Sequence, residues 1–277
     1  VMARQYRHSS GAQLVSSGPC QNALKMRSKC AHSALTVHSV PVMLPCMADA
    51  YPAVEQRLGR HLTEWVGQWP PLADGITVVG DPARLQPTWD GSIRKLLGVG
   101  NGEATIIAVP PPQADAVAAA LSDGPDRAGL GDELGAILGT GPARFGAGVF
   151  RSTTDVDPTI EALGEWVTTQ TSNLPPWLAP FNGPRLVARN NAGEVIASVG
   201  IKIHDRFGYE ISVVTEAEAR GRGFARRLVA TAARWVLDDG AIPTYLHQPS
   251  NLASAHVAEA VGFADNGWTV HGLWPRS

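Results

Sequence analysis

The stretch ARGRGFARR at residues 219–227 carries the clearest chemical signal in the sequence. It contains four arginines: Arg220, Arg222, Arg226 and Arg227. A helix is predicted to begin here, and its first amide groups already carry partial positive charge, so the arginines and this helix end repel each other. Gly221 and Gly223 let the backbone turn sharply, and free N–H groups at a helix N-terminus bind anions. A bound pyrophosphate would offset both charges; alternatively, the arginines form a solvated face.

Other phosphate-binding motifs fit this sequence poorly. The chain has no G-x4-G-K-[ST] segment, and Arg226 stands where G-x-G-x-x-G requires its last glycine. The segment GVGNG at 98–102 precedes a predicted strand rather than a helix, which favours a hairpin turn over a nucleotide site. The phosphate hypothesis therefore depends on the elements around residues 219–227.

Those elements predict a mixed sheet with helices on its faces. Runs of β-branched residues indicate strands, and apolar residues at steps of three to four indicate helices. In order, we expect a helix that begins at Asp157 and includes Val167, a hairpin over 185–203 with its turn at 191–193, a strand at 208–215, a helix from about 224, a strand at 242–248, a helix at 251–262 and a strand at 268–274.

The region from Met47 to residue 150 predicts a smaller α/β unit. Apolar periodicity places a helix at 53–69, and proline and glycine clusters separate the segments that follow. After that helix we expect strands at 75–80 and 103–110, helices at 111–123 and 131–141, and a strand at 144–153. No catalytic constellation is evident in this region, so we expect it to shape an acceptor site or a homodimer.

Two motifs in the C-terminal half resemble the GNAT superfamily of N-acetyltransferases. Arg220–Ala225 has the form R-x-x-G-x-A after a strand that ends in VVT, as in that superfamily's acetyl-CoA loop. The segment NLASAHVAEAVGF is similar to its second motif, with Asn251, Ser254, Gly262 and Phe263 in the matching places. The resemblance covers about residues 150–277. It implies a GNAT-like α/β fold at 151–277, with a mostly antiparallel mixed sheet, after a smaller unit at 47–150 and an extension at 1–46.

The resemblance implies acetyl-CoA as acyl donor and no metal. Backbone amides of the loop would hold the pyrophosphate, and the pantetheine arm would pair with the preceding strand. Asn251 would hydrogen-bond the arm, and an N–H near Val214 would stabilise the oxyanion. The strand at 242–248 would splay away from 208–215 to admit the substrates. The implied cofactor-binding residues are Val213, Val214, Thr215, Arg220, Gly221, Arg222, Gly223, Phe224, Ala225, Arg226 and Asn251.

The implied reaction is direct attack of an amine on the thioester, which requires removal of a proton from the amine. Glu210, on the strand beside the expected cleft, is the candidate general base, and the alternative is an ordinary surface carboxylate. His204 is a weaker candidate. The family's usual acid, a tyrosine seven residues after the motif's asparagine, is Ala258 here. Ser254 is the candidate substitute, with His256 and Tyr245 as alternatives, unless the thiolate leaves unassisted.

Charge and cysteine content limit the partners. Residues 1–46 contain five basic and no acidic residues, which leaves 18 basic against 25 acidic residues, or −7, from Met47 onward. We therefore expect no nucleic-acid partner, and a small-molecule or peptide amine as acceptor. All three cysteines precede Met47, so no disulfide framework is expected for the fold.

Residues 1–46 are rich in serine and lack periodicity, so this basic extension is expected to be disordered. Met47 before an amphipathic segment suggests that the extension lies upstream of the true start. The sequence has no long apolar run, so we expect a cytoplasmic protein without membrane contact. Two rival functions remain open: an acyl-CoA-binding sensor or scaffold with little turnover, and a nucleotide-dependent enzyme that uses the same loop.

Overall fold

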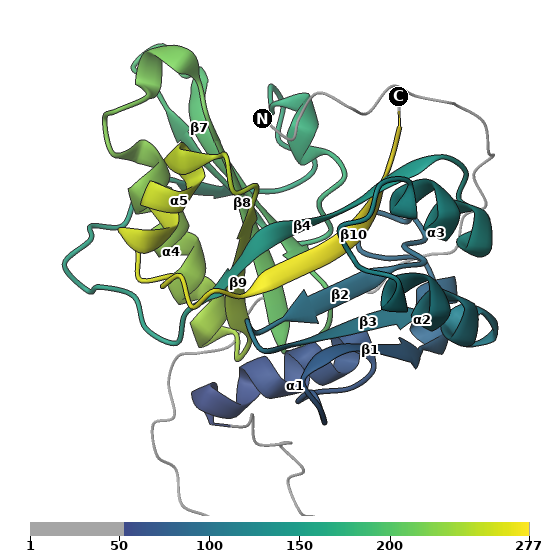
Figure 1. The fold of residues 1–277 in the computed structure, drawn as a ribbon. Helices are drawn as coiled ribbons and strands as arrows, with labels where there is room; N and C mark the ends of the chain where they lie inside the picture. The colour runs from purple at the N-terminus through teal and green to yellow at the C-terminus, as the bar shows by residue number, and fades with distance from the viewer. Residues whose placement is uncertain (1–52, 277) are drawn as a thin grey trace, which may run out of the picture. The chain divides into compact units, whose positions relative to one another are not determined.

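The computed structural model describes residues 53–276, so the expectations for residues 1–46 lie outside the described residues. One mixed sheet of ten strands organises them (Figure 1), in the order β1-β3-β2-β10-β4-β9-β8-β7-β6-β5. The strands are β1 (Gly75–Gly80), β2 (Leu97–Gly100), β3 (Ala104–Val109), β4 (Ala143–Ser152), β5 (Glu165–Val167), β6 (Arg185–Arg189), β7 (Val195–Ile203), β8 (Gly208–Thr215), β9 (Ile242–His247) and β10 (Thr269–Pro275). None of the described helices is long and apolar enough to cross a membrane.

The expected fold class is confirmed, because the sheet is mostly antiparallel and helices flank it. Among the described strands, only the pairs β1–β3 and β8–β9 are parallel. The helices are α1 (Val54–Val66), α2 (Ala114–Ser122), α3 (Leu130–Leu138), α4 (Phe224–Asp238) and α5 (Leu252–Glu259). Short 3-10 turns lie at η2 (Pro82–Leu85), η3 (Pro111–Gln113), η4 (Pro176–Leu178) and η5 (Ala217–Ala219).

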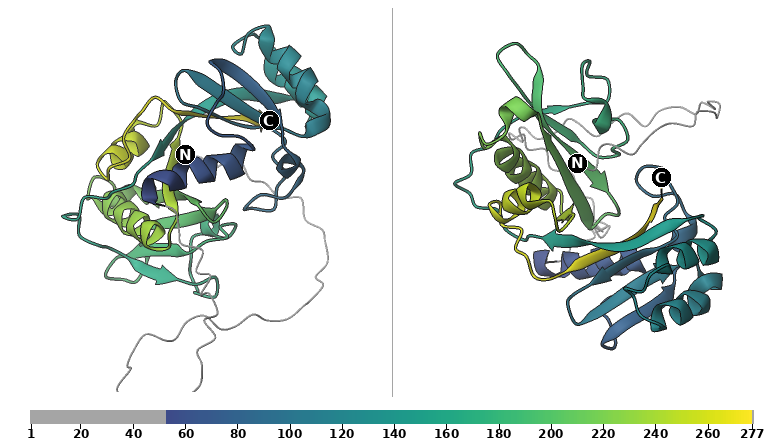
Figure 2. Two further views of the ribbon diagram at one scale, coloured as in Figure 1. Left: turned by 90° about the horizontal axis from the view of Figure 1, so that it is seen from below. Right: turned by 45° about the horizontal axis from the view of Figure 1, so that its top comes forward.

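The two faces of the sheet carry different helices. Side chains alternate along β4, so Phe145 packs with α2 and α3 whereas Phe150 packs with Leu62 of α1. Odd-numbered residues of β7, β8 and β9 pack against α4 and α5. Figure 2 shows α1 and the α2–α3 pair on opposite sides of the sheet. Even-numbered residues of β8 therefore face the side of α1.

Helix α4 is held to the sheet by a continuous apolar face. Its buried residues recur at helical spacing and contact β7 and β8. Each fully buried Val or Leu side chain contributes about 1.5–3 kcal/mol relative to exposure. The buried residues are Leu228, Val229, Ala230, Ala232, Ala233 and Val236. This packing fixes the position of the helix N-terminus and of the glycine loop that precedes it.

The expected border at residue 150 falls inside β4. That strand pairs with β9 on one side and with β10 on the other, and β10 also pairs with β2. The last strand of the chain thereby links the strands on both sides of the border into one sheet. A division of 53–276 into two domains stays a prediction.

Most of the expected elements are present, but the helix predicted from Asp157 is wrong. Asp157 accepts hydrogen bonds from the N–H and hydroxyl of Thr159, as a capping residue does, yet only one turn follows. Gly164 has a φ of +103°, and a Cβ there would come within 2.6 Å of Leu228. The chain is therefore extended against α4, and β5 follows. The hairpin expected at 98–102 is confirmed by the β2–β3 pairing.

Candidate active site

A fork opens between β8 and β9. The two strands pair in parallel only from Gly208 to Glu210 on β8, opposite Ile242 to Thr244 on β9. Both strands continue beyond this point, to Thr215 and His247. The divergence expected from the sequence is therefore present, and along its second half one edge of β8 has no strand partner among residues 53–276.

The hydrogen-bond pattern shows which main-chain groups face the fork. The N–H of Ile242 donates to the carbonyl of Phe207 on the β9 side, whereas Glu216 donates to Ile196 on the β7 side. Since these directions alternate along a strand, the main-chain groups of Val213 and Thr215 face the fork. Those of Val214, the residue expected to supply the oxyanion donor, face β7.

The glycine loop ends beside this edge. Gly221 and Gly223 have φ values of +72° and +78°, and a Cβ on either would meet nothing within 4 Å. The backbone conformation rather than crowding therefore requires glycine here. Gly223 is the N-cap of α4, and no side chain in the described part of the chain caps the helix. The first amides of α4 are thus available to an anion.

Three of the four arginines have partners within the chain, and the first of them, Arg220, donates to the carbonyl of Thr215 at 3.3 Å. Arg227 forms an ion pair with Glu161 at 3.0 Å and also donates to the carbonyls of residues 161 and 162. Arg226 lies 4.0 Å from Asp157. Arg226 and Arg227 therefore contact the 157–162 segment, and these contacts explain part of their placement. Arg222, with its guanidinium 5.2 Å from the ring of Phe224, is exposed.

The other end of α4 is also compensated from within the chain. Arg57 of α1 donates to the carbonyl of Leu237 at 3.0 Å, in the last turn, where a cation is favourable. Asp239 accepts a hydrogen bond from the hydroxyl of Tyr209 at 2.8 Å. The helix therefore carries unfavourable charge at both ends, arginines at its start and Asp239 just after its last residue, and contacts with other elements partly compensate both.

Asn251 and Ser254 have local structural roles. The side chain of Asn251 caps α5 by accepting from the N–H of Ser254 at 3.1 Å. The hydroxyl of Ser254 contacts Tyr245 of β9; burial raises the pKa of Tyr245, and this hydrogen bond lowers it less. Tyr245 therefore stays protonated at neutral pH. Ala258 is buried one turn after Ser254, in the same core cluster as Tyr245.

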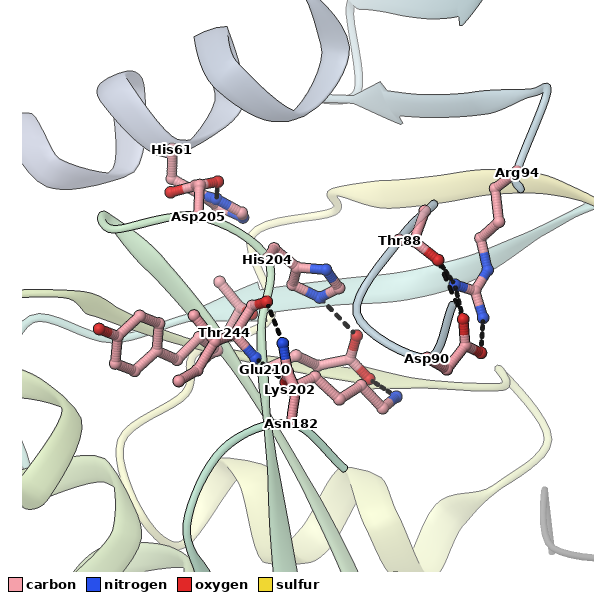
Figure 3. Close-up of polar contacts among 12 residues, drawn as sticks. His61, Thr88, Asp90, Arg94, Asn182, Lys202, His204, Asp205, Glu210 and Thr244 are labelled. Atoms are coloured by element: carbon pink, nitrogen blue, oxygen red, sulfur yellow. Dashed lines mark hydrogen bonds and ion pairs between the residues drawn. The ribbon is translucent and has the colours of Figure 1, made fainter. Parts of the chain in front are cut away.

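Glu210 lies in a buried polar cluster on the α1 side of the sheet (Figure 3). It is ion-paired to Lys202 directly opposite on β7, and it accepts a hydrogen bond from Nε2 of His204 at 3.1 Å. Burial opposes ionisation, but Lys202 and His204 outweigh it and lower the pKa of Glu210 to about 2. A carboxylate this acidic is a poor base at neutral pH.

His204 suits proton abstraction better than Glu210 does. Burial lowers the pKa of His204, so the ring is neutral at pH 7. Because ionised Glu210 can only accept, Nε2 of His204 must carry the proton. Nδ1 then presents a lone pair, and it has no hydrogen-bond partner among residues 53–276.

Aromatic residues from two loops border the same cluster. The ammonium of Lys202 lies 5.0 Å from the ring centroid of Trp89 and 5.9 Å from that of Phe181. Neither ring belongs to a predicted strand or helix, so periodicity gave no signal for them. The pair Lys202–Glu210 could have been found from the register of the β7–β8 hairpin, because cross-strand neighbours of opposite charge attract.

Comparison with known proteins identifies part of the chain. Residues 155–263 match the model of the acetyltransferase (GNAT) family. This segment is a GNAT-family domain. It includes the fork, the glycine loop and α5, whereas α1 and the loop that carries Trp89 lie outside it. A comparison with curated proteins gave no significant match.

Several solved structures are similar to parts of the chain. A putative GNAT acetyltransferase from Novosphingobium aromaticivorans is 21% identical, with a TM-score of 0.39, over 48% of this chain and 66% of its own. A GNAT acetyltransferase from Colwellia psychrerythraea is 12% identical, with a TM-score of 0.38, over 51% and 61%. A GCN5-related N-acetyltransferase-like protein from Streptococcus suis is 17% identical, with a TM-score of 0.37, over 61% and 71%. The chain thus spans about two thirds of their length.

A separate cavity of about 660 Å³ lies outside the GNAT domain. It is bordered by the start of α3, by β4 and by β10, and its wall includes Arg144 and His271. Within the described residues, no group of three or more His, Cys, Asp or Glu side chains is placed to hold a metal ion.

Proposed function

We propose that this protein is an N-acetyltransferase that transfers the acetyl group of acetyl-CoA to an amine by direct attack in a ternary complex. The single observation that carries the proposal concerns the residues that the structure describes: the N-terminus of α4, which follows glycines and has no side-chain cap among them, adjoins an edge of β8 that pairs with none of their strands. The helix N-terminus suits a diphosphate, and the strand edge suits the peptide-like pantetheine arm. Membership of 155–263 in the GNAT family supports the same reading.

The donor would be held mainly by main-chain groups. Amides of residues 221–226 would bind the pyrophosphate, with Arg220 and Arg222 beside them. The main-chain groups of Val213 and Thr215 would pair with the arm, and the side chain of Asn251 would use its amide while its oxygen caps α5. We assign the oxyanion donor to the N–H of Val213 instead of that of Val214; such donors contribute about 2.7–4 kcal/mol to the transition state.

On the acceptor side, we assign the base to Nδ1 of His204. Glu210 would hold the ring of His204 in the required tautomer, and Lys202 would keep Glu210 ionised. The attacking amine forms a C–N bond as the C–S bond breaks, and its proton passes to His204. The CoA thiolate leaves unassisted or takes a proton from Tyr245 or Ser254. The acceptor class is a cationic small molecule or peptide, because the charge of −7 after Met47 attracts cations.

Release of free thiol from acetyl-CoA tests this proposal, with polyamines, aminoglycosides and peptide N-termini as acceptors. We expect at least one amine to raise thiol release well above the rate without acceptor. Protection from thermal unfolding by CoA but not by ATP or NAD would dispose of a nucleotide-dependent enzyme. Thiol release at the background rate with every amine would contradict the transferase proposal.

A second candidate function is an acyl-CoA sensor with little turnover. Two observations favour it: Ala258 occupies the place of the family's usual tyrosine, and Glu210 is locked to Lys202. The sensor would bind acetyl-CoA tightly and release no thiol with any acceptor. Localisation in the cytoplasm and assembly as a homodimer remain proposals under either function.

A further inference from the structure

The cavity of about 660 Å³ lies on the face of the sheet that α2 and α3 cover. Phe145, which packs with those helices, lines it together with Thr105 and His271, and each of the three belongs to a different strand. None of its walls comes from the GNAT segment 155–263. Its volume falls in the range of about 300–1,000 Å³ that is typical of sites for small molecules. The cavity is therefore a candidate ligand site apart from the fork.

The floor of this cavity is polar. A Cβ on Gly100 of β2 would lie 2.6 Å from Oγ1 of Thr105 and 2.8 Å from Oγ1 of Thr269, so the two hydroxyls flank this glycine. Oγ1 of Thr269 is also 2.9 Å from Nε2 of His271. Among residues 53–276, no hydrogen bond engages Nδ1 of His271 or the hydroxyl of Thr105. These groups are thus available to a polar ligand.

Two aromatic rings form part of the wall. The ring centroids of Phe145 and His271 are 5.8 Å apart, and the rings are nearly parallel, with 21° between their planes. Burial lowers the pKa of His271, and the nearby carboxylate of Asp126 raises it by less, so the imidazole is neutral at pH 7. Neutral rings add no positive charge to the wall, and the face of an aromatic ring attracts cations.

Two arginines of the wall are already neutralised by acidic residues of α3. Arg127, in the loop between α2 and α3, forms an ion pair with Glu133 and also donates to the carbonyl of residue 120 at 3.3 Å. Arg276 forms an ion pair with Asp132 at 2.8 Å. Neither arginine therefore leaves a free positive charge for an anionic ligand.

Two carboxylates of the wall are not neutralised in this way. Glu103 and Asp126 line the cavity, are exposed and form no ion pair with any described residue. Arg144 does not balance them: it shares the α1 side of β4 with Phe150, and its guanidinium lies 5.5 Å from the ring centroid of Trp274. The cavity thus combines two unpaired negative charges with a neutral aromatic and hydroxyl surface.

We propose that this cavity binds a small organic diamine whose ammonium groups face Glu103 and Asp126. Its carbon chain would lie against Phe145 and Ile76, an apolar side chain that is 39% exposed at the cavity wall. A metal ion suits the cavity less well, because no group of three or more His, Cys, Asp or Glu is placed to hold one in the described part of the chain. Since the GNAT domain contributes none of the walls, this site is independent of the proposed function.

Isothermal calorimetry on the full-length protein tests the class of ligand. The probes are putrescine and succinate, which have four-carbon chains and opposite charges, together with calcium chloride. We expect saturable binding of putrescine at millimolar concentration or below, and none of succinate, because the unpaired charges of the wall are negative. No saturable heat from putrescine, equal binding of succinate, or tighter binding of calcium would each overturn the proposal.

Substitutions that keep side-chain size remove the two charges. Glu103→Gln and Asp126→Asn should each weaken putrescine binding by about threefold, and by about tenfold together, as expected for exposed ion pairs. Asp115→Asn is the matched control, since Asp115 is an exposed carboxylate in the first turn of α2 that does not line the cavity. We expect this control to bind like wild type. Equal affinities in all the variants would overturn the assignment of the two carboxylates.

Ala147→Phe tests the cavity itself. Ala147 is exposed, lies opposite His271 in the β4–β10 pairing and lines the cavity, so a phenyl ring would fill part of the space. We expect putrescine binding to weaken about tenfold or more, with affinity for acetyl-CoA unchanged. Unweakened putrescine binding in folded Ala147→Phe would place putrescine elsewhere, as an acceptor at the fork for example, and overturn the proposal. If this variant fails to fold, the two carboxylate variants still decide the question. None of these readouts needs thiol release, so failure of the proposed function would leave them valid.

Discussion

The glycine loop at 220–226 and the polar cluster around Glu210 are two different ways of building a binding site. The loop is exposed and offers main-chain groups, so its requirements are a backbone conformation and free amides. The polar cluster is buried and depends on side chains from α1, β7, β8 and the turn between the two strands. A main-chain site is encoded by a short local motif, whereas a side-chain site is assembled only by the fold.

The largest effect is expected from a substitution that disrupts the glycine loop and leaves the polar cluster intact. Gly223→Asp should weaken CoA binding by about 100-fold or more, because like charges 4 Å apart near a protein surface repel by about 4 kcal/mol. Isothermal calorimetry measures this. Gly193→Asp is a matched control, since Gly193 lies in the β6–β7 turn with a φ of +82° and equally open space. Equal affinities for both variants would contradict the loop assignment.

Glu210→Gln breaks the cluster without affecting the loop. The pKa of Glu210 in the folded protein is about 2, below its usual value of 4.5, so its ionisation contributes stability above pH 4.5 that is lost as the pH falls toward 2. The loss of the ion pair should lower the free energy of unfolding at pH 7 by roughly 2–3 kcal/mol. Urea unfolding at pH 3 and pH 7 measures it. A difference between variant and wild type that does not shrink toward pH 3 would count against this account.

Two arginines near the loop are expected to differ in role: Arg222 is exposed, whereas Arg227 contacts the 157–162 segment. Arg222→Ala should weaken CoA binding about tenfold at unchanged stability, because a charge-assisted hydrogen bond contributes about 1.5–3 kcal/mol. Arg227→Ala should instead lower Tm by about 2–4 °C through the loss of its contacts with the 157–162 segment, with little change in affinity. Calorimetry and thermal unfolding on both variants check this. The reverse assignment of the two effects would show that Arg227 binds the phosphates.

Asn251 should give the smallest effect. Asn251→Ala removes the cap of α5 and should lower stability by about 1 kcal/mol. Asn251→Asp keeps an acceptor for the N–H of Ser254 but loses the amide donor. We therefore expect near-normal unfolding in urea for Asn251→Asp, together with weaker CoA binding. Normal affinity in this variant would restrict Asn251 to capping.

Local patterns predicted those parts of the fold that depend on local interactions. The turn at 191–193 and the glycines at 98–102 specified hairpins, because positive φ and strand alternation are encoded within a few residues. The capping pattern at Asp157 led to the wrong prediction of a helix, because the same side-chain hydrogen bonds form at a single turn and at a helix. The contact of His61 with Asp205 spans 144 positions, and no periodicity connects such residues. The pairing of Lys202 with Glu210 lowers the pKa of Glu210, and for this reason we propose His204 rather than Glu210 as the base.

Backbone amide hydrogen exchange with and without acetyl-CoA is the most direct test of the main-chain binding site. The account predicts slower exchange at Val213 and at the amides of 221–226 when the ligand is bound, with Val214 unchanged because its N–H already faces β7. Protection confined to other regions, or equal exchange with and without acetyl-CoA at Val213 and the loop, would contradict it.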